Sequence, residues 1–107
     1  MNDKERSFPK GISSGILYLT ENALIYRSKS INEDRAPTIM LFTDIISIKR
    51  IQSLRTMRLL AGTRKSLEIS MEGRKKPLQF IGLAQRDDFF ERIESVCARV
   101  DARIHFL

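Results

Sequence analysis

Lysine and arginine side chains, which bind phosphate groups well, are concentrated in one segment of this chain. Residues 49–76 contain nine basic and two acidic side chains and so carry +7, whereas the full chain of 107 residues carries +6 at pH 7. Guanidinium and ammonium groups bind phosphate oxygens through charge-assisted hydrogen bonds. Because a charge confined to one segment gives the folded domain a directional field, the sequence predicts a surface for an anionic partner.

The candidate anion-binding residues lie in predicted loops or near the ends of predicted strands, where long side chains can reach a phosphate. The expected contact residues are Arg64, Lys65, Arg74, Lys75 and Lys76, assisted by Lys49, Arg50 and Arg58. They form one patch only if a strand end, an arginine-rich connection and a hairpin tip lie at the same end of the fold.

Apolar residues between these cations offer a second kind of membrane contact. Residues 54–62 are expected either as a strand, with Met57, Leu59 and Leu60 in the core, or as an exposed loop whose side chains insert into a bilayer. The engaged cations alone provide about 4 to 5 kcal/mol, which corresponds to near-millimolar binding. Each inserted apolar side chain adds roughly 1.5 to 3 kcal/mol. Stable recruitment therefore requires both signals or a second tether.

Residues that carry catalysis or bind metals are sparse. His105 is the only histidine, and no cluster of Cys, His and carboxylate residues has metal-ligand spacing. Cys97 falls on the apolar stripe of a predicted helix and is expected in the core. Asp87 and Asp88 diverge by about 100° on that helix, so they suit the helix start better than a shared substrate. The sequence thus predicts no enzyme, no cofactor and no metal site.

Composition narrows the class of partner and the compartment. Residues 49–76 contain no Phe, Tyr or Trp, which argues against nucleic acid as a partner despite a pI near 9.9. No apolar run is long enough to span a membrane, and no signal region follows the charged residues 1–6. A single cysteine suits a reducing compartment. We therefore expect the protein to be located in the cytoplasm.

Short runs of β-branched and other apolar residues predict the strands that position the cations. The expected strands are Ile16–Thr20, Leu24–Ser28, Thr38–Phe42, Ile45–Ile51, Ser66–Met71 and Leu78–Ile81. Ile46, Ile48 and the stem of Arg50 are expected on one face of their strand. The first two strands read as a hairpin with a short polar turn.

After Gln85 the apolar spacing changes to three and four, which predicts a helix from Gln85 to Val100 with Phe89 or Phe90 on its buried stripe. One helix after six or seven antiparallel strands predicts a mainly β fold. The expected architecture is a strongly bent sandwich or partly open barrel, capped by this C-terminal helix. One domain is expected over residues 8–101, followed by a tail, 102–107, without an assigned role.

Four segments of the chain share an order and spacing that point to a known family. They are Gly15–Tyr26, Ile39–Ile48 with its Asp-Ile pair, Leu67–Ser70, and Phe80–Phe90, in which Arg-Asp opens the helix. In this order they resemble the first hairpin, the following strand pair, the later strands and the helix start of GRAM domains, a branch of the pleckstrin-homology superfold. The family's first strand has little room here. We expect either Phe8–Ser13 as a shortened first strand, or an excised or atypical version of the domain.

The resemblance implies a seven-stranded, helix-capped sandwich that binds phosphoinositides or other anionic lipids and sometimes proteins. In GRAM domains of membrane-contact proteins, a loop at the place of residues 54–62 presents apolar side chains to a bilayer. Together with the basic segment, the resemblance leads us to expect a non-catalytic module, peripheral to anionic membranes. The alternative is a protein-interaction module that binds an acidic peptide or a ubiquitin-like partner and localises a larger assembly.

Overall fold

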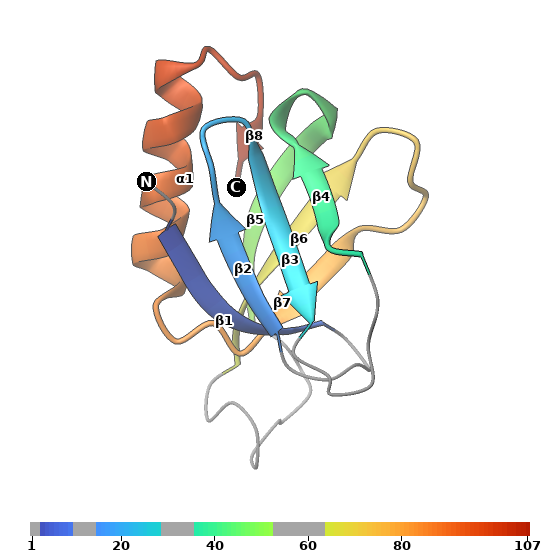
Figure 1. The fold of residues 1–107 in the computed structure, drawn as a ribbon, viewed down its shortest axis with the longest axis vertical. Helices are drawn as coiled ribbons and strands as arrows, with labels where there is room; N and C mark the ends of the chain where they lie inside the picture. Colours follow the sequence, from blue (N-terminus) through green and yellow to red (C-terminus); the bar gives the residue numbers. More distant parts are fainter. Residues whose placement is uncertain (1–2, 10–14, 29–35, 53–63) are drawn as a thin grey trace.

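The computed structural model describes residues 3–9, 15–28, 36–52 and 64–107, which form eight strands, a short 3-10 helix and one α-helix (Figure 1). The strands are β1 (Asp3–Pro9), β2 (Gly15–Leu19), β3 (Ala23–Ser28), β4 (Thr38–Leu41), β5 (Ile45–Gln52), β6 (Lys65–Met71), β7 (Leu78–Ile81) and β8 (His105–Phe106). The helices are η1 (Phe42–Asp44) and α1 (Arg86–Arg99). The predicted class, mainly β with one C-terminal α-helix, is confirmed.

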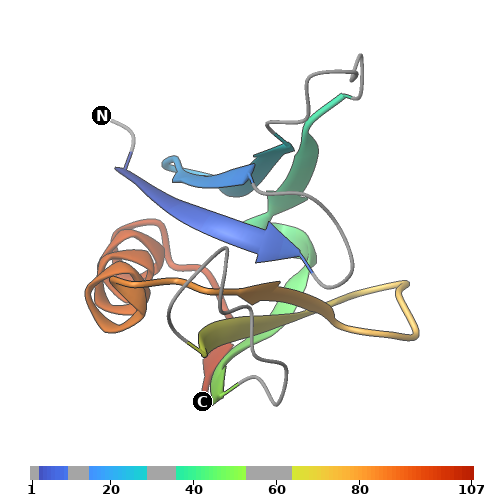
Figure 2. The same ribbon diagram turned by 90° about the horizontal axis from the view of Figure 1, so that it is seen from below.

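The strands follow the spatial order β4-β3-β2-β1-β7-β6-β5-β8. β1 joins the two halves of the sheet, because its residues 3–7 pair with β2 while Phe8 and Pro9 pair with β7. A bend at this strand folds the halves over one another as two layers, and α1 closes one side of the sandwich (Figure 2). The layers are not closed into a barrel, since β4 and β8 end the strand order.

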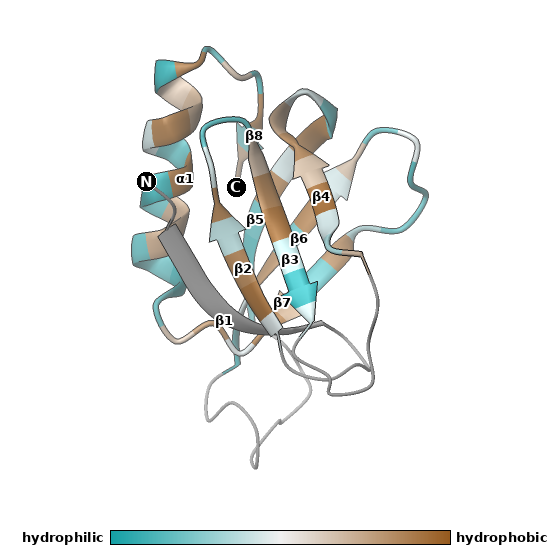
Figure 3. Cartoon of the chain, in the orientation of Figure 1, coloured by the Kyte–Doolittle hydropathy of each residue, from teal (hydrophilic) through white to brown (hydrophobic). Residues whose placement is uncertain are grey.

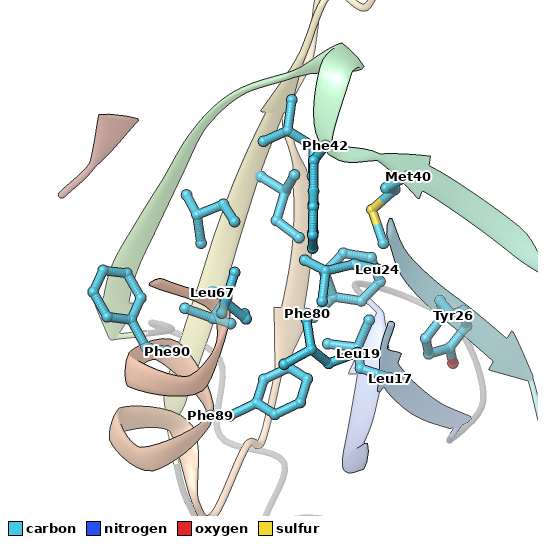
Figure 4. Packing of buried hydrophobic residues seen from close by; sticks show 14 of the residues in the cluster. Leu17, Leu19, Leu24, Tyr26, Met40, Phe42, Leu67, Phe80, Phe89 and Phe90 are labelled. Carbon is cyan, nitrogen blue, oxygen red and sulfur yellow. The ribbon is translucent and has the colours of Figure 1, made fainter. Parts of the chain in front are cut away.

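The hydrophobic core lies between the two layers and α1 (Figure 4). The alternation of apolar residues along β2 and β6 produces it, because Leu17, Leu67 and Ile69 point inward and are fully buried. The buried stripe of α1 includes both Phe89 and Phe90, where the sequence left the choice open. Each side chain of this size contributes roughly 1.5 to 3 kcal/mol when it is fully buried.

One predicted face is wrong at the start of β5. The register between β5 and β6 shifts between Ile45 and Ser47, which marks a β-bulge. A bulge adds one residue to one strand and so changes which residues point inward. Ile45 and Ile48 are therefore buried, whereas Ile46, expected to share the face of Ile48, is 49% exposed.

Two strands near the ends of the chain, β1 and β8, lie where the sequence did not place them. The first strand is not Phe8–Ser13 but begins at Asp3, so the residues before Gly15 include a strand of ordinary length. The segment 102–107, expected as a tail, contributes β8, which pairs in parallel with β5. Its addition brings the described strands to eight, above the six or seven expected. Isolated two-residue strands have no sequence signal, because their pairing depends on the neighbouring strand.

Gly15 is required by a close approach of β3. A Cβ atom at this position would lie against the Tyr26 hydroxyl and 2.6 Å from the Arg27 carbonyl oxygen. We expect Gly15→Ala to lower the free energy of unfolding by about 1 to 3 kcal/mol, measured by urea denaturation. Part of the loss should disappear in a Tyr26→Phe background, which removes one of the clashing atoms. Equal losses in both backgrounds would contradict this account.

Candidate functional site

Four of the candidate cations lie at the end of the β5–β6 pair where the chain passes from β5 to β6. Lys49 and Arg50 are near the end of β5, and Arg64 and Lys65 stand at the start of β6, paired in the register Gln52↔Lys65. All four are exposed, and we call them the hairpin-end cluster. The other candidates of this region, Arg58 and the apolar residues Met57, Leu59 and Leu60, lie outside the described residues.

Part of the hairpin-end cluster is engaged by the fold. Lys49 stands directly opposite Glu68 on β6, where opposite charges stabilise the strand pair. The guanidinium carbon of Arg50 lies 4.5 Å from the centroid of the Phe90 ring, within the range of a cation–π contact. Arg50 therefore serves the packing of β5 against α1 as well as the surface charge.

The remaining candidates, Arg74, Lys75 and Lys76, occupy the turn between β6 and β7, and we call them the turn cluster. All three are exposed, and no ion pair joins them to any residue that the structure describes. Gly73 (φ +83°) supplies the left-handed conformation of the turn, and the Arg74 N–H donates to the Met71 carbonyl oxygen at 3.2 Å. The turn holds three consecutive cations away from the sheet.

The structure does not bring all the cations together. The hairpin-end cluster precedes β6 and the turn cluster follows it, so the length of a seven-residue strand separates them. At about 3.3 Å per residue this is roughly 20 Å. The condition for one compact patch, that all three elements lie at one end of the fold, is therefore not met.

Exposed apolar side chains lie near the turn cluster, and the sequence did not single them out. Leu41 and Ile46 flank η1 and are 41% and 49% exposed. The Asp44 carbonyl oxygen of η1 accepts a hydrogen bond from the Glu72 N–H at the start of the turn, at 2.8 Å. Both views place β4 and the turn on the side of the sandwich away from α1 (Figures 1 and 2). Figure 3 shows hydrophobic colour along β4 and hydrophilic colour in the turn.

We call Leu41, Ile46 and the turn cluster together the turn edge. The exposure of Leu41 could not be predicted from the sequence, because an apolar residue on the outer face of an edge strand has the same local pattern as one in the core. The exposure of Ile46 was also missed, because the bulge changes which residues of β5 point inward at that place.

A second candidate site is a pocket of about 820 Å³ at the end of the domain that carries η1 and the last turn of α1. Three segments line it: the β2–β3 turn, η1 with the first residue of β5, and the chain that follows α1. Figure 1 shows these segments at the same end of the molecule. The lining residues are Thr20, Glu21, Asn22, Phe42, Thr43, Ile45, Val100, Asp101, Ala102 and Arg103.

The wall of this pocket that follows α1 is held by a Schellman-type helix end. The Val100 N–H donates to the Val96 carbonyl oxygen, and the Ala102 N–H donates to the Cys97 carbonyl oxygen at 2.9 Å. Asp101 stands between them with φ at +56°, a conformation that costs most residues about 1 kcal/mol. The helix end thus fixes where Asp101 and Arg103 lie.

Asp101→Gly is expected to raise the free energy of unfolding by about 0.5 to 1 kcal/mol, because glycine adopts positive φ without a steric cost. Urea denaturation checks the value. Asp101→Val provides the opposite control, since a β-branched residue is disfavoured at positive φ and should destabilise the domain. If the valine variant were as stable as the glycine variant, strain at this position would not matter.

The residues considered for catalysis carry no reactive arrangement. Cys97 is buried, and its burial raises the pKa of the thiol to about 11, so the thiol stays protonated at neutral pH. His105 is exposed on β8. Within the described ranges, no three His, Cys, Asp or Glu side chains gather as metal ligands. None of the described helices is long and apolar enough to cross a membrane.

These features define a small helix-capped β-sandwich with exposed basic clusters and one candidate pocket. A family model of the GRAM domain matches residues 3–102. The chain therefore belongs to the GRAM domain family, and the resemblance found in the sequence is confirmed. Domains of this family generally serve membrane and protein interactions, and they are not a known family of enzymes.

Similar segments occur in larger proteins named GRAM domain-containing protein 4. The chain is 29% identical over 103 residues to the protein of Xenopus laevis and 30% identical over 94 residues to that of Homo sapiens. These matches cover 95% and 87% of this chain, but only 17% and 16% of the relatives. The chain thus spans a small part of the length of the relatives that it matches.

A solved structure has the same fold. The crystal structure of the C-terminal domain of an unknown protein from Leishmania infantum superposes with a TM-score of 0.63 at 16% sequence identity. The match covers 88% of this chain and 80% of that chain. At this identity the likeness concerns the fold alone.

Proposed function

We propose that this GRAM domain is a non-catalytic module that binds anionic membrane surfaces, with phosphoinositides as the preferred class of lipid, on the cytoplasmic side of the membrane. The observation that carries the proposal is the turn edge, where Arg74, Lys75 and Lys76 stand exposed near the apolar side chains of Leu41 and Ile46. Peripheral membrane proteins combine these two kinds of contact, because cations bind lipid headgroups while apolar side chains enter the interface.

The turn edge supplies enough free energy for reversible binding. Three cations near an anionic surface contribute about 3 kcal/mol, and two apolar side chains contribute roughly 1.5 to 3 kcal/mol each when they are fully transferred. The sum of about 6 to 9 kcal/mol corresponds to dissociation constants from tens of micromolar to a few tenths of a micromolar, before insertion costs. Charge alone would stay in the millimolar range.

The hairpin-end cluster is a second contact in this proposal. Because it lies at the opposite end of β6, both clusters reach one flat membrane only when β6 runs along its surface. Arg64 and Lys65 would then bind headgroups beside Arg58, and Met57, Leu59 and Leu60 would insert between them. Lys49 and Arg50 would add charge from β5.

Vesicle flotation tests the proposal. We expect the domain to float with vesicles that contain phosphatidylserine or a phosphoinositide, and to stay in solution with phosphatidylcholine alone. Binding should weaken at high salt, because exposed charges are screened. At equal vesicle charge, tighter binding to phosphoinositide would support a preferred headgroup. Absence of binding to every anionic vesicle would reject the membrane function.

One observation favours the alternative, a protein-interaction module. Among the described strands β4 ends the sheet, and the Phe42 N–H donates to the Asn22 carbonyl oxygen at 2.9 Å. Hydrogen-bonded pairs alternate in an antiparallel ladder, so the main-chain groups of Ile39 and Leu41 point away from β3. An extended acidic peptide could add a strand there, with the turn cluster nearby. Failure of flotation together with capture of an acidic peptide would favour this function.

A further inference from the structure

The pocket beside η1 differs in chemistry from the basic turn edge. Phe42 and Ile45 are only 4% exposed each and form its apolar floor, while Val100 is 48% exposed where the pocket opens. Its volume of about 820 Å³ falls within the range in which proteins bind small ligands. An apolar floor below a polar rim is the usual form of such sites.

The rim of the pocket carries mixed charge. Glu21 and Asp101 are exposed carboxylates on the rim, and Arg103 is the basic residue of the same lining. The rim therefore has a net charge of −1 in a chain whose net charge is +6. A purely anionic ligand would meet two carboxylates there, whereas a ligand with an ammonium group beside a phosphate has a partner for each charge.

The walls of the pocket are held in place by hydrogen bonds of the main chain and of one threonine. The Phe42 N–H donates to the Asn22 carbonyl oxygen, which ties η1 to the β2–β3 turn. In that turn the Thr20 hydroxyl oxygen accepts from the Ala23 N–H at 3.1 Å. The Schellman-type end of α1 fixes Asp101 on the opposite wall. A pocket with fixed walls loses little entropy when a ligand binds.

We propose that this pocket binds a zwitterionic amphiphile of the phosphocholine type, with its ammonium group at Glu21 and Asp101, its phosphate at Arg103, and its aliphatic chain on Phe42 and Ile45. The site is independent of the proposed membrane contact, because it shares no residue with the turn edge. A phospholipid whose headgroup joins an ammonium to a phosphate has this chemistry.

Titration of the isotope-labelled domain with octylphosphocholine below its critical micelle concentration tests the proposal. Backbone amide shifts in two-dimensional NMR should concentrate at residues 20–22, 42–45 and 100–103. Three probes with the same octyl chain separate the contributions of the two headgroup charges to binding. Octyltrimethylammonium carries only the cation, octyl sulfate carries only an anion, and octyl glucoside carries neither charge. At the pocket amides we expect octylphosphocholine to bind tightest and octyl sulfate weakest.

Substitutions that remove one charge at a time test which side chain binds the ammonium group and which binds the phosphate. Glu21→Gln and Asp101→Asn should each weaken octylphosphocholine binding by about two- to fivefold, since exposed ion pairs contribute little individually. Asparagine tolerates the positive φ of position 101, so the wall keeps its shape. Arg103→Gln should weaken octylphosphocholine to a similar degree but leave octyltrimethylammonium unchanged or tighter.

The variant Lys75→Glu with Lys76→Glu is the matched control, because it changes charge outside the pocket. It should bind octylphosphocholine as the unmodified domain does, even though its vesicle binding is lost. Each of four results would overturn the pocket assignment. Octylphosphocholine could shift amides mainly on other surfaces, or shift none. Octyl sulfate could bind at the pocket amides as tightly as octylphosphocholine, or the Glu21 and Asp101 variants could bind octylphosphocholine unchanged. Vesicle flotation of the pocket variants should remain normal, so the two proposals fail separately.

Discussion

The paired substitution Lys75→Glu and Lys76→Glu is expected to lower the affinity for anionic vesicles about a thousandfold. Each change removes one favourable contact of about 1 kcal/mol and adds a repulsion of similar size, so the total is about 4 kcal/mol. Both side chains are exposed in the turn after β6 and take part in no described ion pair, so the fold should be unaffected. Vesicle flotation and a titration against vesicles measure the loss.

The matched control is Arg64→Glu with Lys65→Glu, which makes the same change in net charge at the other end of β6. If the turn edge is the principal contact and the hairpin-end cluster only a second one, this control should lose much less affinity than the turn variant. Equal losses would indicate that β6 lies along the membrane, with both clusters engaged. A larger loss in the control would show that the turn edge is not the principal contact.

Phe90→Ala is expected to lower the free energy of unfolding by about 3 to 5 kcal/mol, a large part of the 5 to 15 kcal/mol typical of a whole domain. The ring is 3% exposed and joins three elements, because it belongs to α1, lies below the Arg50 guanidinium of β5, and meets Phe106 of β8 edge to face at 5.5 Å. Its removal leaves a cavity and two partners without their contact. Urea denaturation followed by circular dichroism measures the loss.

Phe89→Ala is the control that separates the contact of Phe90 with β8 from the general loss of buried apolar surface in the core. Phe89 is also 3% exposed, so a similar global loss is expected. The Leu107 N–H donates to the Ile48 carbonyl oxygen and reports the docking of β8 on β5. Its hydrogen exchange should accelerate more in Phe90→Ala than in Phe89→Ala. Identical acceleration in both variants would show that Phe90 does not hold β8.

The elements that local patterns predict were those found in the structure. The hairpin of β2 and β3, the pair of β6 and β7, and α1 follow from alternation and helical spacing, which depend on neighbouring residues. The features that were missed depend on distant partners. The bulge after Ile45 exists only in relation to β6, and β8 is a strand only because β5 offers an edge.

The sequence by itself determined that this is a mainly β domain with +7 concentrated in residues 49–76, because apolar periodicity and charge are local properties. Only the tertiary structure decided how that charge is displayed. The extended β6 places the residues before and after it at opposite ends of the strand, and its pairing with β5 and β7 holds it in the sheet, so one segment of sequence became two clusters. The same folding brought Glu21 and Asp101, far apart in the chain, to the rim of one pocket.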